Sequence, residues 1–137
     1  MADREKPLPA PIEATAPFWE GLRHGQVRIQ HCNACDGWVW YPRHRCNTCL
    51  SDDLTWEVVS GAGTLHTFTI ARQATHPAFA DEVPQLLAVV ELDQGVKLTS
   101  TLVEIEPEAV RIGQRLEPVF AQVSDDVVLL RFRPSSL

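Results

Sequence analysis

The sequence predicts a mainly β protein in which a short N-terminal helix and a small metal-binding ribbon precede a five-stranded barrel. Three observations lead to this prediction. All four cysteines fall in one short segment with paired spacing. Hydrophobic and polar residues alternate on both sides of that segment, as in strands, and only residues 15–24 show a helical period. We therefore divide the chain into an arm and helix over 1–25, a ribbon over 26–60 and a barrel over 61–137.

The first predicted element is a helix over residues 15–24, which follows a proline-rich extended arm. Pro17 suits its first turn, and Gly25 can end it. A helix of about ten residues is not stable alone in water, so its apolar face must pack against this chain or against another subunit. We predict a partner-binding role for this face, which consists of Phe18, Trp19 and Leu22.

The cysteine pattern predicts a metal site with the spacing C-x2-C, ten residues, C-x2-C, made by Cys32, Cys35, Cys46 and Cys49. Each pair brings two thiolates within reach of one cation, and two pairs complete a tetrahedral four-thiolate site. We predict one zinc ion per chain, with iron in a rubredoxin-type site as the alternative. Two disulfides, or four unrelated thiols, are the other interpretations. The charged N-terminus lacks the apolar segment of a secretion signal, so we expect a cytoplasmic protein in which disulfides rarely persist.

The residue after each cysteine pair bears on the geometry of this site. The backbone turns left-handed there in metal knuckles, and glycine is common at that position. Here Asp36 follows the first pair and Leu50 follows the second. Aspartate tolerates this conformation better than most residues, so the sequence favours the first knuckle over the second.

Three strands are predicted around the cysteines, over residues 27–30, 38–41 and 54–58, which together form a zinc ribbon. Three of the four tryptophans of the chain lie in it: Trp38, Trp40 and Trp56. They either form the small core that a ribbon otherwise lacks or make an aromatic patch for a partner. We favour the small core.

Five further strands are predicted over residues 64–71, 86–92, 96–103, 115–123 and 127–133. One helical turn at 107–110 separates the third from the fourth, which is the order of an OB-fold barrel. A five-stranded sandwich fragment is the alternative. The connection over residues 73–84 is long for a compact barrel, and loops of that length are more often functional than idle. We predict that His76 and Phe79 in this loop help to bind a partner.

The motifs of common catalytic sites are absent from the sequence. The four thiols are assigned to the metal, and we find no phosphate-binding glycine loop, no G-x-S-x-G and no H-E-x-x-H. A closed four-thiolate site also has no open position for water. We therefore predict no catalytic residues and no activity of the isolated chain.

The charge balance limits the partners of the chain. The formal net charge is −6, whereas proteins that bind a phosphate backbone normally present a basic face. No apolar run reaches the roughly 18 residues of a membrane-spanning helix, so we expect no membrane partner. An OB-fold with a zinc ribbon can nevertheless be a nucleic-acid-binding module, which stays as the alternative function.

Several short segments of the chain together resemble one known family. They are Pro17-Phe18-Trp19-Glu20-Gly21, the two cysteine pairs with Tyr41-Pro42-Arg43 between them, Ser60-Gly61-Ala62-Gly63-Thr64-Leu65, Val89-Val90-Glu91-Leu92-Asp93-Gln94-Gly95-Val96 and Val110-Arg111-Ile112-Gly113. Across about residues 15–123 the chain closely resembles the acyl-CoA-associated family of rubredoxin-like zinc-ribbon plus OB-fold proteins, long filed as a domain of unknown function.

The resemblance implies a small non-catalytic accessory subunit that forms a hetero-oligomer with a thiolase-like enzyme. In that family the partner is a thiolase, an aldolase or a condensing enzyme acting on acyl-CoA thioesters, in some members in steroid or aromatic degradation. Zinc would hold the ribbon, and the barrel would help to cover the partner's acyl-CoA site. Contact between acyl-CoA and this chain in the complex is part of that expectation.

Overall fold

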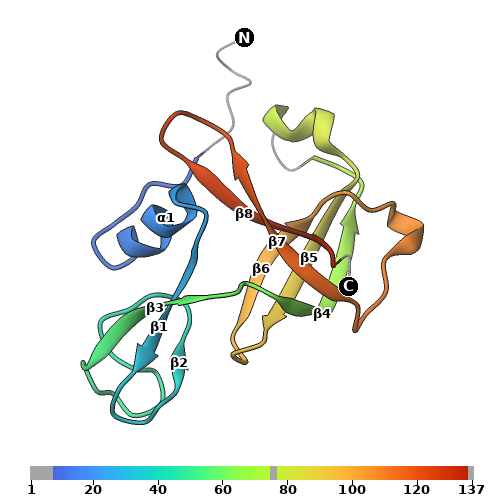
Figure 1. The fold of residues 1–137 in the computed structure, drawn as a ribbon. Helices are drawn as coiled ribbons and strands as arrows, with labels where there is room; N and C mark the ends of the chain where they lie inside the picture. Colours follow the sequence, from blue (N-terminus) through green and yellow to red (C-terminus); the bar gives the residue numbers. More distant parts are fainter. Residues whose placement is uncertain (1–7, 75–76, 136–137) are drawn as a thin grey trace.

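The computed structural model describes residues 8–74 and 77–135, which form two β structures, one short α-helix and two 3-10 helices (Figure 1). The ribbon is a three-stranded sheet, and the rest of the strands make a closed five-stranded barrel. The predicted fold class is confirmed. Within the described ranges, no helix combines the length and the apolar character that crossing a membrane requires.

Helix α1 spans Ala16–Arg23 and has proline in its first turn. Thr15 precedes the helix, and its hydroxyl accepts a hydrogen bond from the Ile12 N–H at 3.0 Å. The chain leaves the helix through Gly25, whose φ of 71° lies in the left-handed region that glycine adopts without strain. Figure 1 shows α1 beside strand β8 of the barrel, above the ribbon.

The ribbon sheet has the order β2-β1-β3, with β1 over Val27–Cys32, β2 over Trp38–Val39 and β3 over Leu54–Val59. Strand β2 is two residues shorter than predicted. After β2, a side chain and not a pair of strand backbones connects the segment around Arg43 to β1. The amide of Gln30 donates to the Arg43 carbonyl at 2.8 Å and accepts from the Arg43 N–H at 2.9 Å.

The barrel strands follow the predicted order: β4 over Gly63–Ala71, β5 over Gln85–Leu92, β6 over Lys97–Leu102, β7 over Arg115–Gln122 and β8 over Val128–Pro134. They close in the order β4-β5-β6-β8-β7. A single 3-10 turn, η3 over Pro107–Ala109, lies between β6 and β7. Strand β5 alternates strictly between half-buried and buried residues, as the period of two of a β-strand requires.

The main hydrophobic core fills the barrel and continues into the ribbon. Phe132 and Val90 are completely buried within the barrel, and Val27 and Ile29 of β1 belong to the same cluster. Gly61 marks the passage between the two parts. A Cβ added there would lie 2.8 Å from a Pro118 side-chain carbon and 2.9 Å from one of Val27. The ribbon and the barrel therefore share one core across this junction.

The ribbon tryptophans do not form a core around the cysteines. The small cluster at the cysteine site consists of Cys32, Cys46 and Val39, with Leu54 packed against it. Trp38 instead packs against the main core, Trp56 packs against the cluster beneath α1, and Trp40 contacts both. The favoured interpretation of the three rings is corrected accordingly: they fill the junction between the helix, the ribbon and the barrel.

The long connection after β4 contains a 3-10 helix, η2, over Pro77–Glu82. Ala78 is buried in it and Phe79 is half-buried. His76, predicted from the sequence as a partner-binding residue, lies outside the described residues.

Candidate metal centre and partner surface

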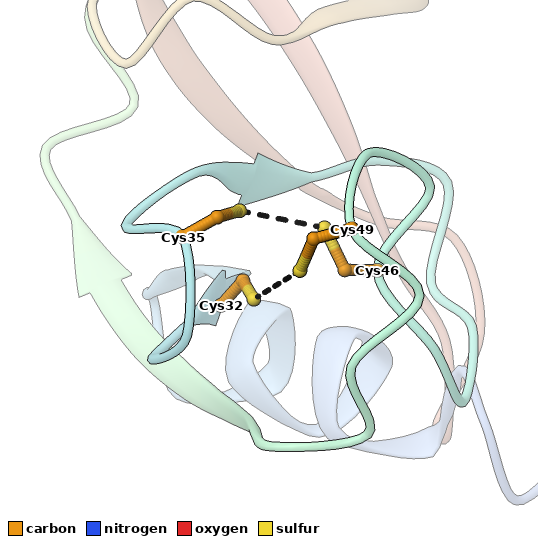
Figure 2. A group of neighbouring side chains, drawn as sticks. All are labelled: Cys32, Cys35, Cys46 and Cys49. Carbon is orange, nitrogen blue, oxygen red and sulfur yellow. Dashed lines mark hydrogen bonds between the residues drawn. The ribbon is translucent and has the colours of Figure 1, made fainter.

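The four cysteines converge from two loops of the ribbon (Figure 2). Their sulfur atoms all lie within 4.8 Å of one another, with 3.5 Å between Cys32 and Cys49 and 3.7 Å between Cys35 and Cys46. Four thiolates around one zinc at about 2.3 Å form a tetrahedron whose edges are about 3.8 Å long. The observed spacing thus fits a four-thiolate metal site.

The spacing does not fit the disulfide interpretation. A disulfide joins its sulfurs at about 2.05 Å, whereas these sulfurs are separated by 3.5 and 3.7 Å, and all four cysteines are free. His31, which adjoins the first pair, has other contacts: its Nε2 lies 3.4 Å from an Asp36 carboxylate oxygen, and its ring packs edge-on against Trp38. Among the described residues, the metal-ligand group at this position contains the four cysteines alone.

Both cysteine pairs adopt the same knuckle backbone. Asp36 has a φ of 63° and Leu50 a φ of 65°, so each residue after a pair is left-handed. The N–H of Asp36 bonds the Cys32 carbonyl at 2.9 Å, and the N–H of Leu50 bonds the Cys46 carbonyl at 3.0 Å. The weaker second knuckle expected from the sequence is therefore not observed. The left-handed backbone is unfavourable for leucine, but the Leu50 side chain is exposed and adds no crowding of its own.

Backbone N–H groups point at the sulfurs and stabilise negative charge there. The N–H groups of Cys49 and Thr48 lower the pKa of the Cys46 thiol to about 6. At Cys35 the Gly37 N–H also lowers the pKa, but the Cys32 thiol, desolvation and the other two thiols together outweigh it and raise the pKa to about 12. A cation shared by all four sulfurs removes this competition, since each thiol then binds as thiolate. The arrangement suits a structural metal ion. Four thiolates fill its tetrahedral coordination sphere, so no coordination position is left for a reacting water.

The predicted partner-binding residues of α1 fall into two groups. Phe18 is 6% exposed and Leu22 is 1% exposed, because both pack against Val128 of the barrel and the ribbon tryptophans. These two side chains are interior, which corrects their predicted role at a partner surface. Trp19 is half-buried and meets the Phe18 ring edge-on at 5.2 Å. Trp19 and the half-buried Phe79 stay as candidates for partner contact.

A groove that the sequence did not predict opens beside Trp19, with a volume of about 260 Å³. We call it the junction groove, because it lies between α1, the segment after β2, and strands β6 and β8. Its lining residues are Phe18, Trp19, Trp40, Tyr41, Leu98, Thr99, Ser100, Thr101, Leu129, Leu130 and Arg131. No local sequence signal marks it, since it forms only when elements distant in the chain pack together.

The fold and the cysteine cluster define a class: a zinc-ribbon protein with a C-terminal OB-fold barrel. Comparison with known families gives the same two parts. Residues 19–55 match the family described as "ChsH2, rubredoxin-like zinc ribbon domain", and residues 56–121 match "ChsH2, C-terminal OB-fold domain". The chain belongs to this family of ChsH2-type proteins, also named for the domain DUF35.

Individual relatives come from bacteria and archaea. The chain is 33% identical over 132 residues to the "Probable enoyl-CoA hydratase alpha subunit" of Thermomonospora curvata, a match that covers 95% of this chain and 40% of the relative. It is 32% identical to a "DUF35 domain-containing scaffold protein" of Methanocaldococcus jannaschii, covering 73% of this chain and 69% of the relative. The chain thus spans well under half of the length of the first relative.

A solved structure resembles the chain over nearly its whole length. The structure described as "Ltp2-ChsH2(DUF35) aldolase" contains a chain with 31% sequence identity and a TM-score of 0.84. The match covers 93% of the present chain and 98% of that chain. The similarity therefore includes the helix, the ribbon and the barrel together.

Proposed function

We propose that this protein is a zinc-binding, non-catalytic accessory subunit of a thiolase-like enzyme that acts on acyl-CoA thioesters. The reaction of that enzyme would be of the thiolase, aldolase or condensing type, and steroid or aromatic degradation is the pathway class the family suggests. One zinc ion per chain, bound by the four cysteines, would hold the ribbon in place. The two subunits would form a hetero-oligomer.

The similarity to the ChsH2(DUF35) chain of the aldolase structure carries this proposal. The similarity extends over 93% of the present chain, and the aldolase is described by the name of that chain together with a second component, Ltp2. A relative covering the same region is named an enoyl-CoA hydratase alpha subunit, and another is named a scaffold protein. The words subunit and scaffold and the paired name Ltp2-ChsH2 support the proposal that this chain works with a partner enzyme.

The chemistry of the described residues supports a role without catalysis. The thiols, the strongest nucleophiles of the chain, are gathered at the metal site, where coordination uses each sulfur. A structural four-thiolate site leaves no metal position for a substrate. We therefore expect the chemical step to take place on the partner enzyme.

We do not favour the nucleic-acid alternative. OB-folds generally bind their ligands on the face of the second and third strands, here β5 and β6, using stacked aromatic rings and cations. The central outward residues of that face are aliphatic or carry hydroxyls, as at Leu87, Val89 and Thr99, and the cation at its end, Lys97, is paired in register with Glu91. We expect no tight, salt-sensitive binding of single-stranded oligonucleotides by the isolated protein.

Co-purification tests the proposed complex. The chain would be expressed with the thiolase-like product of a neighbouring gene, first unaltered and then as Trp19→Ala, with Ile112→Ala as a control. Ile112 is 66% exposed and does not line the junction groove. We expect Trp19→Ala to weaken the complex about thirtyfold or more, as truncation of an aromatic anchor commonly does.

The melting temperature separates contact from folding in this test. A lost complex with an unchanged melting temperature supports docking through Trp19. A retained complex with a large loss of stability would show that Trp19 belongs to the core of its own chain. No complex with any thiolase-like partner would contradict the proposed function itself.

A further inference from the structure

The guanidinium of Arg131, on strand β8, has no acceptor at hydrogen-bond distance among the described residues. Its side chain is only 22% exposed, and the Glu82 carboxylate lies 3.8 Å from Nη1, beyond hydrogen-bond distance. Within residues 8–74 and 77–135, its guanidinium makes no hydrogen bond. Two residues further along the same strand, Arg133 donates to Glu117 at 2.9 Å and to Glu104 at 3.2 Å. Five donors of a largely buried Arg131 are therefore available to a ligand.

Arg131 stands where two hollows of the surface meet. On one side is the junction groove, in which Arg131 is the only charged lining residue. On the other side is a hollow of about 380 Å³ that Arg131 shares with the carboxylates of Glu82 and Glu106. Like charges disfavour an anion in the second hollow, whereas the junction groove presents a cation and no carboxylate. An anion would therefore approach Arg131 from the groove.

The other walls of the groove suit a flat apolar body. Trp19, Trp40 and Tyr41 form an aromatic side, in which the Trp40 and Tyr41 ring centroids lie 5.3 Å apart at 77°. The lining contributed by β6 includes Thr99 and Thr101, which carry hydroxyls. Large apolar walls with a few placed polar groups are typical of small-molecule sites. The volume of about 260 Å³ limits the ligand to one or two rings or a short chain.

We propose that the junction groove binds a small organic carboxylate, whose charged end pairs with Arg131 and whose apolar body lies against Trp40 and Tyr41. A guanidinium fork matches both oxygens of a carboxylate. A monoanion is favoured over a phosphate ester because Arg131 supplies one positive charge, part of which Glu82 already balances. This binding is a property of the isolated chain and does not rest on the partner enzyme, so its failure and that of the proposed function are distinguishable.

Three probes with the same naphthalene body test the inference: 2-naphthoate, the neutral 2-naphthalenemethanol and 2-naphthyl phosphate. Titration calorimetry would be done on the zinc-loaded full chain. We expect saturable binding of naphthoate, at least about tenfold weaker binding of the alcohol, as for loss of a charge-assisted hydrogen bond, and no advantage for the phosphate. Equal affinity for naphthoate and the alcohol, tighter binding of the phosphate, or no saturable naphthoate binding would overturn the proposal.

Two pairs of variants assign the binding to the groove. Arg131→Gln should remove the preference for naphthoate over the alcohol, whereas Arg133→Gln, on the same strand but outside the groove, should keep it. Tyr41→Ala should weaken the binding of naphthoate and of the alcohol, while Tyr41→Phe should bind both as the unaltered protein does. Tyr41 is 52% exposed, so both variants should fold. A preference that survives Arg131→Gln, or naphthoate affinity unaffected by Tyr41→Ala, would place the probe elsewhere and contradict the proposal.

Discussion

The ribbon and the barrel achieve a fixed structure by different means. Around the cysteines, the ribbon has only Val39 and Leu54 as apolar partners, and its strand β2 has two residues. The barrel instead buries a continuous cluster that includes Phe132, Leu65 and Val90, each at most 1% exposed. Metal coordination thus replaces a hydrophobic core in one part, whereas apolar packing suffices in the other.

The junction limits this contrast, because the two parts are not independent. Val27 and Ile29 belong to β1 of the ribbon but pack in the barrel core. Trp40 and Trp56 extend from the ribbon to the cluster beneath α1. We therefore expect an asymmetric dependence: the barrel can keep its strands when the cysteine loops unfold, but the loops have no core of their own.

The largest expected effect is that of removing the metal. Structural zinc contributes about 10–16 kcal/mol in small peptide sites, and the cysteine loops have few other contacts to hold them. Cys46→Ala, or a strong chelator, should therefore abolish hydrogen-exchange protection in the loops between Cys32 and Leu54. Protection of β4, β5 and β6 should persist, though weakened, as amide exchange read by mass spectrometry would show.

Controls for the metal experiment are an adjacent substitution and elemental analysis. Asn47→Ala lies between the ligands, is exposed, and should retain one zinc per chain with normal protection. Loss of protection in the ribbon and the barrel together would show one cooperative unit and break the comparison. A chain without metal, or a red protein with iron, would contradict the zinc assignment.

The second effect in size concerns the barrel core. Phe132 is completely buried, and Phe132→Ala should lower the free energy of unfolding by about 3–5 kcal/mol, because it leaves a cavity among well-packed side chains. Urea unfolding of the zinc-loaded protein measures this loss. The exposed Val58→Ala, a truncation on the ribbon, should cost little. A small loss at Phe132 would mean that the metal, rather than apolar packing, dominates the barrel as well.

Local signals were enough to predict most elements. The paired cysteines, the alternation of Val27 and Ile29 with polar residues in β1, and the turn signals between strands each act over a few residues, so the ribbon, the strand order and the metal ligands could be read directly. Leu50 is an exception within the ribbon: its own propensity disfavours the left-handed backbone, but two hydrogen-bonded cysteine knuckles impose it.

The surface of the protein could not be predicted in the same way. A helical period places Phe18, Trp19 and Leu22 on one apolar face, but it does not say whether that face meets the barrel or a partner; the structure buries two of the three. Arg131 and Glu82 are distant in sequence and approach only because η2 folds over the barrel. Such sites depend on tertiary packing, which no local pattern encodes.

The third prediction concerns Gly61 at the junction, for which Gly113, just before β7 of the barrel, is a matched control. Gly61 and Gly113 both have positive φ, 78° and 89°, but an added Cβ meets neighbours within 3 Å only at Gly61. Gly113→Ala should cost about 1–2 kcal/mol from backbone strain alone. Gly61→Ala should cost more, because Val27 and Pro118 must also move apart. Equal losses in urea unfolding would show that the ribbon and the barrel are loosely joined.

The smallest expected effect is that of an ion pair on the barrel surface. Arg115 donates to both carboxylate oxygens of Asp93, at 2.8 and 3.1 Å, and these hydrogen bonds hold the pKa of Asp93 below its usual value. The stability from this pair is therefore fully present above about pH 4 and is lost only as the pH falls through the folded-state pKa. Because both side chains are about half exposed, Asp93→Asn should destabilise less than Phe132→Ala, Gly61→Ala or Gly113→Ala. The loss should be equal at pH 6 and pH 8, where zinc stays bound, and should shrink in 1 M salt as screening weakens the pair. A loss that differs between pH 6 and pH 8, or that salt leaves unchanged, would show that Asp93 acts through its backbone turn and not through its charge.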